Sequence, residues 1–181
     1  ILESFFLYGQ ATSGSSEQQR ILIKFPCSGT TAGSLLYDRG QGNIPVSGGV
    51  SFYLRMFNAR HSTATPKDFT LAILPLQQAW NEGTGLDMEN YTDLDAANWI
   101  NAKTASSGPT AWTSQGGDYY DDISSSFSVT FDTGFEDLEV DITTLVEQWI
   151  SSSDNADTAF DMGSKGDHGV LIKMSGTYED G

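Results

Sequence analysis

The residues that could do nucleophilic or acid–base chemistry are few and lie far apart in the chain. There are two histidines, His61 and His168, and one cysteine, Cys27. Both histidines lie in turn-like stretches, ARHSTATP and GDHG, and no G-x-S-x-G nucleophile elbow occurs. A serine or cysteine nucleophile needs a base within reach, and neither imidazole has a partner pattern beside it. We therefore predict no catalytic residue and no enzymatic activity, and we expect Cys27 to be a semi-buried, unreactive thiol.

Paired carboxylates are common in the sequence: Glu136–Asp137, Asp121–Asp122 and Asp87–Glu89. A glycosidase needs two carboxyl groups facing each other across a cleft, a geometry that spacing along the chain does not show. With 24 acidic residues in 181, pairs of this kind arise by chance. We interpret them as solvated loop residues.

The loop GGDYYDD at 116–122 is the best candidate for a bound metal. Its carboxylates, Asp118, Asp121 and Asp122, are the hard oxygen ligands that Ca²⁺ prefers. The glycine and glutamate spacing of an EF-hand is missing, however, and no phosphate-binding or dinucleotide motif occurs. We predict no cofactor and no resident metal, with these three carboxylates as the calcium alternative.

Aromatic residues in polar loops are the candidate binding residues. These are Trp99, Trp112, Tyr119 and Tyr120. Exposed rings of this kind stack on sugars, so the four residues are candidates for glycan binding. The alternative is that they plug the ends of the fold as buried aromatics with a polar tip. By contrast, Trp80 ends an apolar run and Trp149 lies on an apolar helical stripe, so we predict that both are core residues.

Charge and length limit the classes of partner. The net charge is −15, from 9 basic and 24 acidic residues, which disfavours phosphate backbones and anionic membrane surfaces. No apolar run approaches the roughly 20 residues of a membrane span, so no membrane insertion is expected. The charge suits solubility or a basic protein neighbour. With 181 residues and one cysteine, we expect a single domain, 1–181, without an intrachain disulfide.

Alternating apolar residues predict several strands. The predicted strands cover 1–8, 20–25, 50–57, 69–76, 127–131, 138–142 and 170–174. Both faces of 50–57 carry large side chains, so we expect this strand to be central and partly covered on both sides. Pro75 suggests an edge position or a bulge. Residues 27–48 are predicted to be a long connection, and 83–126 to carry function or hide short strands.

One short helix is predicted at about residues 142–151. Ile142, Leu145, Val146 and Trp149 form one apolar stripe at helical spacing. Thr144 with Glu147 has the spacing of a capping box, and Asp141 is a second candidate cap. The predicted fold is therefore an all-β, antiparallel β-sandwich with one short helix.

The order of several segments resembles the DNRLRE-type domain. The segments are RILIKF (20–25), FYL (52–54), WNEG (80–83), DITTLVEQW (141–149) and GVLI (169–172). This domain is related to a family of carbohydrate-binding modules, and the resemblance implies a jelly-roll-like sandwich. The chain also resembles uncharacterised virion structural proteins of tailed, notably marine, bacteriophages, on ILE (1–3) and AWTSQGGD (111–118).

The resemblance implies a non-enzymatic structural component of a phage neck, tail, fibre or head surface. Its expected partners are other virion proteins and further copies of itself, and its expected location is the virion, assembled in the host cytoplasm. The alternative function is a carbohydrate-binding module that recognises a surface glycan. Two departures stand out: Pro26-Cys27 replaces the usual Asp after the first segment, and no strand follows the last. Since the chain also opens without Met, we expect a fragment of a longer chain.

Overall fold

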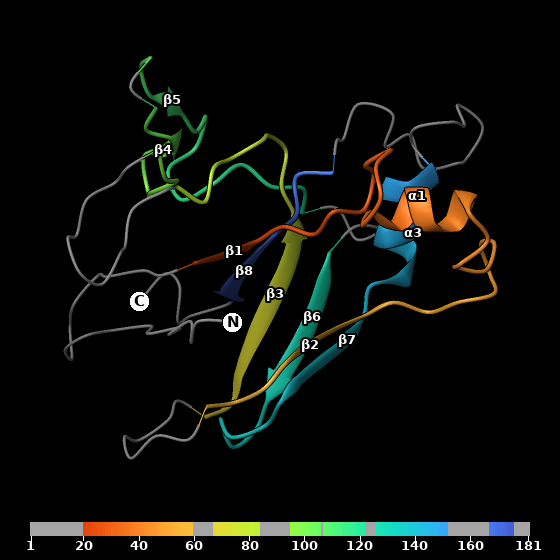
Figure 1. The fold of residues 1–181 in the computed structure, drawn as a ribbon. Helices are drawn as coiled ribbons and strands as arrows, with labels where there is room; N and C mark the ends of the chain where they lie inside the picture. Colours follow the sequence, from red (N-terminus) through yellow and green to blue (C-terminus); the bar gives the residue numbers. More distant parts are fainter. Residues whose placement is uncertain are drawn as a thin grey trace.

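The computed structural model describes residues 20–59, 67–83, 95–105, 107–121, 126–151 and 167–175. Within them lie eight strands and two helices (Figure 1). The elements are β1 (Ile21–Ile23), α1 (Leu35–Gly40), β2 (Tyr53–Met56), β3 (Phe69–Pro75), β4 (Asn101–Lys103), β5 (Thr110–Ala111), β6 (Phe127–Phe131), β7 (Leu138–Asp141), α3 (Thr143–Ser151) and β8 (Val170–Ser175). The predicted strand at 1–8 lies outside the described residues.

Four strands form the main sheet, in the order β1-β8-β3-β6, and every pairing is antiparallel. Ile172 of β8 pairs with Ile21 on one side and Ile73 on the other. Because side chains alternate along a strand, this register places three isoleucines in one row on the same face. That face is buried, and the strands predicted over 20–25, 69–76 and 170–174 are confirmed.

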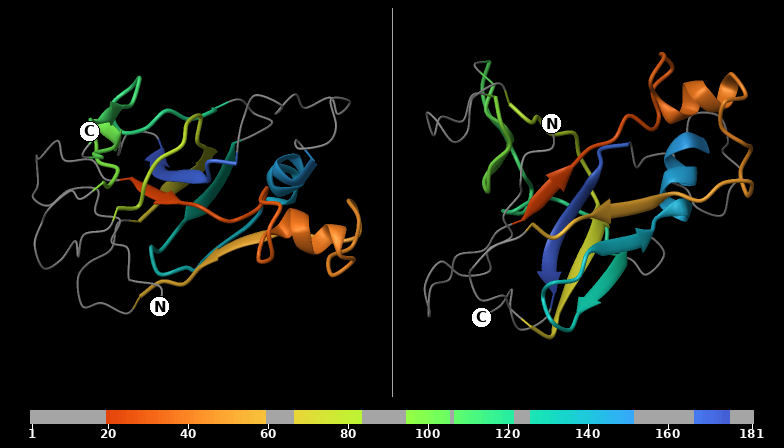
Figure 2. Two further views of the ribbon diagram at one scale, coloured as in Figure 1. Left: turned by 45° about the horizontal axis from the view of Figure 1, so that its top comes forward. Right: turned by 60° about the horizontal axis from the view of Figure 1, so that its bottom comes forward.

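The second layer is the antiparallel pair β2–β7, which faces the main sheet across the principal core (Figure 2). Leu54 and Leu138 contribute buried side chains from this layer, and Phe131 and Met174 contribute from the main sheet. Two antiparallel layers around one core confirm the all-β, sandwich-like prediction. The jelly-roll connectivity stays a prediction.

Helix α3 confirms the predicted apolar stripe. Ile142, Leu145, Val146 and Trp149 are all buried against the core. The backbone N–H of Thr143 donates to a carboxylate oxygen of Asp141 at 2.9 Å, so the second candidate cap performs the capping. A helix this short is marginal alone, and packing of the stripe supplies its stability.

Residues 27–48 connect β1 to β2 as expected, but the helix α1 within this connection was not predicted. The Ser34 hydroxyl accepts from the N–H of Tyr37 and caps the helix. No residue of α1 is fully buried, so its sequence carries no strong apolar stripe. Arg39 binds both carboxylate oxygens of Glu147 on α3, at 2.6 and 2.7 Å. The carboxylate expected to form the capping box therefore holds the two helices together.

Two predictions about strand position are wrong. Among the described residues β2 pairs with β7 alone, and Tyr53 on its second face is 50% exposed, so β2 is not a central strand covered on both sides. Strand β3, in contrast, lies between β8 and β6. Pro75 is tolerated because it lies beyond the last β6 pairing, at Ile73. In this described part no helix is long and apolar enough to cross a bilayer.

Candidate functional site

The outer face of the main sheet is divided into a covered half and an open half. The side chains of Leu22, Leu74 and Leu171 point away from the principal core and form a second core with Trp80 and Trp112. The segment that covers them carries β4 and β5, and lies on the opposite side of the sandwich from the two helices (Figures 1 and 2). Since 83–126 was expected to carry function or hide short strands, β4 and β5 account for the second part of that prediction.

The Gly116-Gly117-Asp118 turn returns this covering segment to the sheet. Both glycines have positive φ, 86° and 109°, a conformation that residues with a Cβ rarely adopt. A Cβ on Gly117 would lie 2.7 Å from a methyl group of Leu171, so the backbone here sits directly on the sheet. The Asp118 carboxylate accepts the N–H groups of Thr113 and Ser114, both at 2.7 Å, and thereby fixes the turn.

A shallow hollow of about 300 Å³ opens where the covering segment ends. Its floor is the uncovered outer face of β3, β6 and β8, and its wall is the chain just after the Asp118 turn. The lining residues are Ala72, Leu74, Tyr119, Asp121, Ser126, Phe127, Ser128, Lys173 and Ser175. We call this the sheet groove. It combines an aromatic ring, one cation, one carboxylate and several hydroxyl groups.

Cations surround the aromatic wall of the sheet groove. The Lys173 amine lies 5.3 Å from the centre of the Tyr119 ring, and the Arg20 guanidinium lies 5.7 Å from the same ring. Arg20 also lies 4.9 Å from the Trp99 ring and donates to the Gly116 carbonyl at 2.9 Å. Both distances to Arg20 are within cation–π range, so this side chain joins the two rings. The result is a basic, aromatic rim on an otherwise acidic protein.

The four loop aromatics do not form one exposed platform. Trp112 is buried and its indole N–H donates to the Asn98 carbonyl at 2.8 Å, as expected for an aromatic plug, so it presents no free ring to a sugar. Trp99 is 37% exposed. Tyr119 is half-buried and lines the sheet groove, while Tyr120 is half-buried outside it. Trp80 and Trp149 are buried, which confirms their prediction as core residues.

The two described calcium candidates, Asp118 and Asp121, lie in different surroundings. Asp118 is buried with its oxygens accepting from Thr113, Ser114 and the Gln78 side chain, while Asp121 is exposed beside the sheet groove. Asp122 lies outside the described residues. Within the described ranges, no group of three or more His, Cys, Asp and Glu residues could hold a metal ion. Asp118 is explained as a turn clamp.

Cys27 and His168 both lie close to Asp167, and burial is the main cause of the pKa shift of each. Cys27 is fully buried rather than semi-buried, and burial, together with the charge of Asp167, raises the pKa of its thiol to about 12. The thiolate is the nucleophilic form, so this cysteine is inert at neutral pH. Desolvation lowers the pKa of His168, and Lys24 adds to this. The Asp167 carboxylate accepts the N–H groups of Cys27 and Ser28 and ties the end of β1 to the start of β8.

The carboxylate pairs of the sequence serve turns where they are described. Glu136 accepts from the N–H and hydroxyl groups of Thr133, both at 2.8 Å, and Asp137 accepts the N–H of Asn58 at 2.7 Å. These contacts fix the β6–β7 turn against the end of β2. His61 and the pair Asp87–Glu89 lie outside the described residues.

Sequence reasoning missed Lys173 and Arg20 as members of the site. Lys173 is the one charged residue in the apolar strand VLIKMS, and it falls at an outward position of β8. A charge inside such a strand is a signal that its side chain faces an open surface, since lysine is rarely buried without a partner. Arg20 directly precedes β1, and its two aromatic neighbours, Trp99 and Tyr119, are distant from it in sequence.

Comparison of the chain with protein-family models, with curated proteins and with solved structures finds no match in any of the three. The resemblance to the DNRLRE-type domain and to phage virion proteins therefore stays a prediction that stands on the sequence segments alone.

Proposed function

We propose that this domain is a non-enzymatic structural component of a tailed-bacteriophage particle that acts through protein–protein assembly. The observation that supports the proposal is an exposed aromatic surface on the second layer. Tyr53, Phe57 and Phe135 are 50%, 80% and 62% exposed, and all three belong to β2 or to the turns at its end and before β7. Large apolar side chains that remain exposed on one layer are candidates for a contact surface in a soluble protein. The phage context comes from the sequence resemblance.

The fixed shape of this surface favours assembly over chemistry. Hydrogen bonds of Asn58 to Asp137 and to the Gly134 carbonyl, at 2.7 and 3.0 Å, hold the ends of β2 and of the β6–β7 turn together. Phe57 and Phe135 are therefore presented from a braced backbone. Cysteine and aspartate are residue types that can be catalytic, but here Cys27 is packed in the core. The carboxylates of Asp118 and Asp167 accept backbone N–H groups and fix the chain.

Cosedimentation with particles tests this proposal. Native source material is fractionated by density-gradient sedimentation, and peptides of this chain are quantified by mass spectrometry in each fraction. We expect them to travel with peptides of capsid or tail proteins at a constant ratio, also after treatment with high salt. Recovery only in the slow, low-mass fractions would contradict the assembly role.

The sheet groove supports a second candidate function, recognition of a polysaccharide. Tyr119 offers a ring for stacking, and Lys173, Asp121 and the serines offer the few convergent polar groups typical of ligand sites. A glycan occupying this groove would be bound along the outer face of the main sheet, and not by a Trp99–Trp112 platform.

Variants at Tyr119 separate binding from folding. We expect Tyr119→Leu to abolish retention on a polysaccharide affinity gel while Tyr119→Phe, which keeps the ring, retains it. Trp112→Ala serves as the control for packing, because removal of a buried tryptophan lowers stability by about 3–5 kcal/mol. Equal retention of the Tyr119→Leu variant and the wild type would exclude the groove as the glycan site.

A further inference from the structure

The outer edge of β2, which no strand of the described residues pairs with, presents its backbone groups in a defined pattern. The N–H of Ile142 donates to the Phe52 carbonyl at 2.9 Å, and the same register continues through Leu54–Val140 and Met56–Leu138. In an antiparallel ladder such hydrogen-bonded pairs alternate with pairs whose N–H and C=O groups point away. Tyr53 and Arg55 therefore direct their backbone groups to the outer edge of β2, where no strand of the described chain pairs with them.

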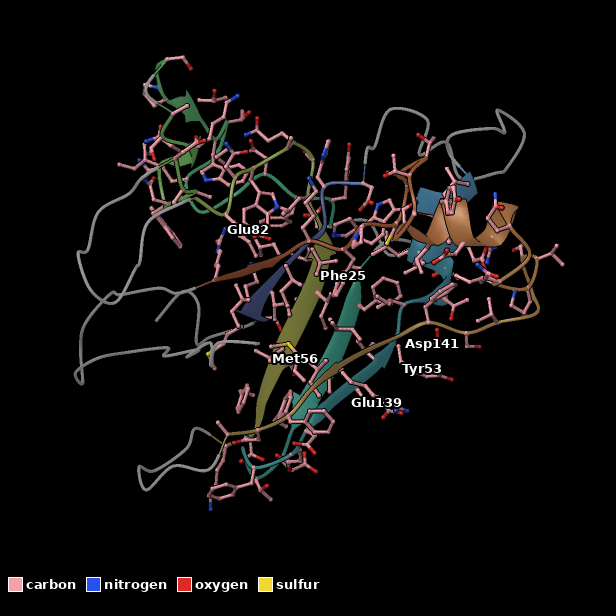
Figure 3. All side chains as sticks on the ribbon, in the orientation of Figure 1. Phe25, Tyr53, Met56, Glu82, Glu139 and Asp141 are labelled. Atoms are coloured by element: carbon pink, nitrogen blue, oxygen red, sulfur yellow. The ribbon has the colours of Figure 1, made fainter. Side chains whose placement is uncertain are left out.

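The side chains next to this edge have complementary chemistry. Arg55 forms an ion pair with Glu139 at 2.8 Å and lies 5.7 Å from the Tyr53 ring. The Arg55 and Glu139 side chains are 58% and 54% exposed, and Tyr53 pairs across the strands with Asp141. Figure 3 marks Tyr53, Glu139 and Asp141 along the β2–β7 pair. The outer face of the β2–β7 pair thus carries two neighbouring cross-strand pairs, Arg55 with Glu139 and Tyr53 with Asp141.

We propose that the β2 edge pairs antiparallel with the β2 edge of a second copy of this chain. With a two-fold axis through Leu54, Tyr53 of each copy lies opposite Arg55 of the other. Opposed side chains in such a pair have Cβ atoms about 5 Å apart, which places each guanidinium within reach of the facing ring. Each row then reads Glu139, Arg55, then Tyr53 and Asp141 of the second copy, with no like charges facing.

Self-complementarity makes a second copy the occupant of this edge. A two-fold contact requires that one surface fit itself, and this register meets that condition at both rows. It also converts two isolated two-stranded layers into one four-stranded layer, and a two-stranded pair is the less stable arrangement. The β6 edge of the main sheet carries the small polar residues Ser128 and Thr130 on its outer face and has no comparable aromatic–cation pattern.

The net charge of −15 on each copy opposes this association, so salt should strengthen it. The inference names a partner for the assembly role proposed above. The test of the β2 pairing uses purified chain alone, so this inference and the assembly role can fail separately. A chain that stays monomeric but travels with particles overturns the β2 pairing and leaves the assembly role standing.

Sedimentation velocity of the full chain, from micromolar to near-millimolar concentration, tests the pairing. The wild type should move from 19.6 kDa toward twice that mass, more readily at about 0.5 M than at about 0.05 M salt. Arg55→Pro removes the outward N–H but no hydrogen bond of the β2–β7 ladder, and it should stay monomeric. Arg55→Thr is the matched control: it loses the same side chain but keeps the N–H, and should still dimerise about threefold to tenfold more weakly.

Hydrogen exchange of the wild type provides a readout that does not depend on a proline variant folding. The amides of Tyr53 and Arg55 should exchange more slowly as concentration rises, while the peptide covering β6 stays unchanged. A chain that remains monomeric at every concentration overturns the proposal. So does a folded Arg55→Pro variant that dimerises as the wild type does, or protection that rises elsewhere but not at Tyr53 and Arg55.

Discussion

The pairing of Arg39 with Glu147 should be one of the stronger polar couplings in the described structure. It joins α1 to α3 through two hydrogen bonds of 2.6 and 2.7 Å, and both side chains are only 15% exposed. An exposed ion pair contributes about 0.2–1 kcal/mol, whereas removing one partner from a buried pair costs about 3–5 kcal/mol. Because this pair is bidentate and mostly, though not fully, shielded from water, an intermediate value is expected.

A double-mutant cycle measures this coupling. For Arg39→Met and Glu147→Met we expect each single change to lower the free energy of unfolding by about 2.5 kcal/mol, and the double change by about 3 kcal/mol. The difference is a coupling of about 2 kcal/mol, which arises because each single variant leaves a charged group without its partner in a shielded place. The assay is urea unfolding followed by far-ultraviolet circular dichroism.

The chain offers a matched control for this cycle. Arg55 and Glu139 form an ion pair of the same chemical type at 2.8 Å, but their side chains are 58% and 54% exposed. Measured at concentrations at which the chain is monomeric, the same cycle on this pair should give a coupling below about 0.5 kcal/mol, and one that salt reduces further. If the Arg39–Glu147 coupling is no larger than that of the control, the reasoning from burial is wrong and α1 is held by its other contacts.

Three further outcomes follow from the structure. Gly169→Ala should lower the free energy of unfolding by about 3 kcal/mol or more, because φ is +84° and the new Cβ would overlap the Ile23 carbonyl oxygen, so that β1 and β8 must separate. A loss under about 1 kcal/mol in urea unfolding would contradict this. Cys27 should resist a thiol reagent in the native state at mildly alkaline pH and react on unfolding, since its pKa is raised to about 12 by burial; rapid stoichiometric labelling of folded protein would show an accessible thiolate. Although desolvation raises the pKa of Glu136, hydrogen bonds from Thr133 and neighbouring backbone lower it from 4.5 to about 2, so its stabilisation is complete above pH 4.5 and is lost as pH falls toward 2. Urea unfolding across this pH range should show a larger loss in the wild type than in Glu136→Gln, which keeps only the contribution of other carboxylates such as Asp141, and parallel curves would refute the assignment.

Local periodicity was sufficient for most of the strands and for one helix. Alternation along 20–25 and 127–131 and the apolar runs at 69–76 and 170–174 identified four strands of the main sheet, because successive side chains of a strand point to opposite faces. The stripe of α3 was equally clear, since four apolar residues at helical spacing are all buried. Both signals are properties of short segments, so they are readable before any tertiary contact is known.

Helix α1 was not readable in this way. It has six residues, none of them fully buried, and its strongest side-chain contact is to Glu147, 108 positions away in the chain. The sheet groove has the same origin: Tyr119 and Lys173 meet only because the Asp118 turn returns the covering segment to the sheet. Contacts of this range depend on the path of the whole chain.

The sequence by itself determined the class of fold, the core residues Trp80 and Trp149, and the absence of a local catalytic motif, because composition and short-range spacing are sufficient for these. The tertiary structure decided which aromatic and charged side chains are used for packing and which face solvent. It buried Trp112, turned Asp118 into a backbone clamp, and placed β2 at an edge with Tyr53 exposed. The physical reason is that burial and strand order depend on which distant segments pack together, and alternation along one strand does not specify its neighbours.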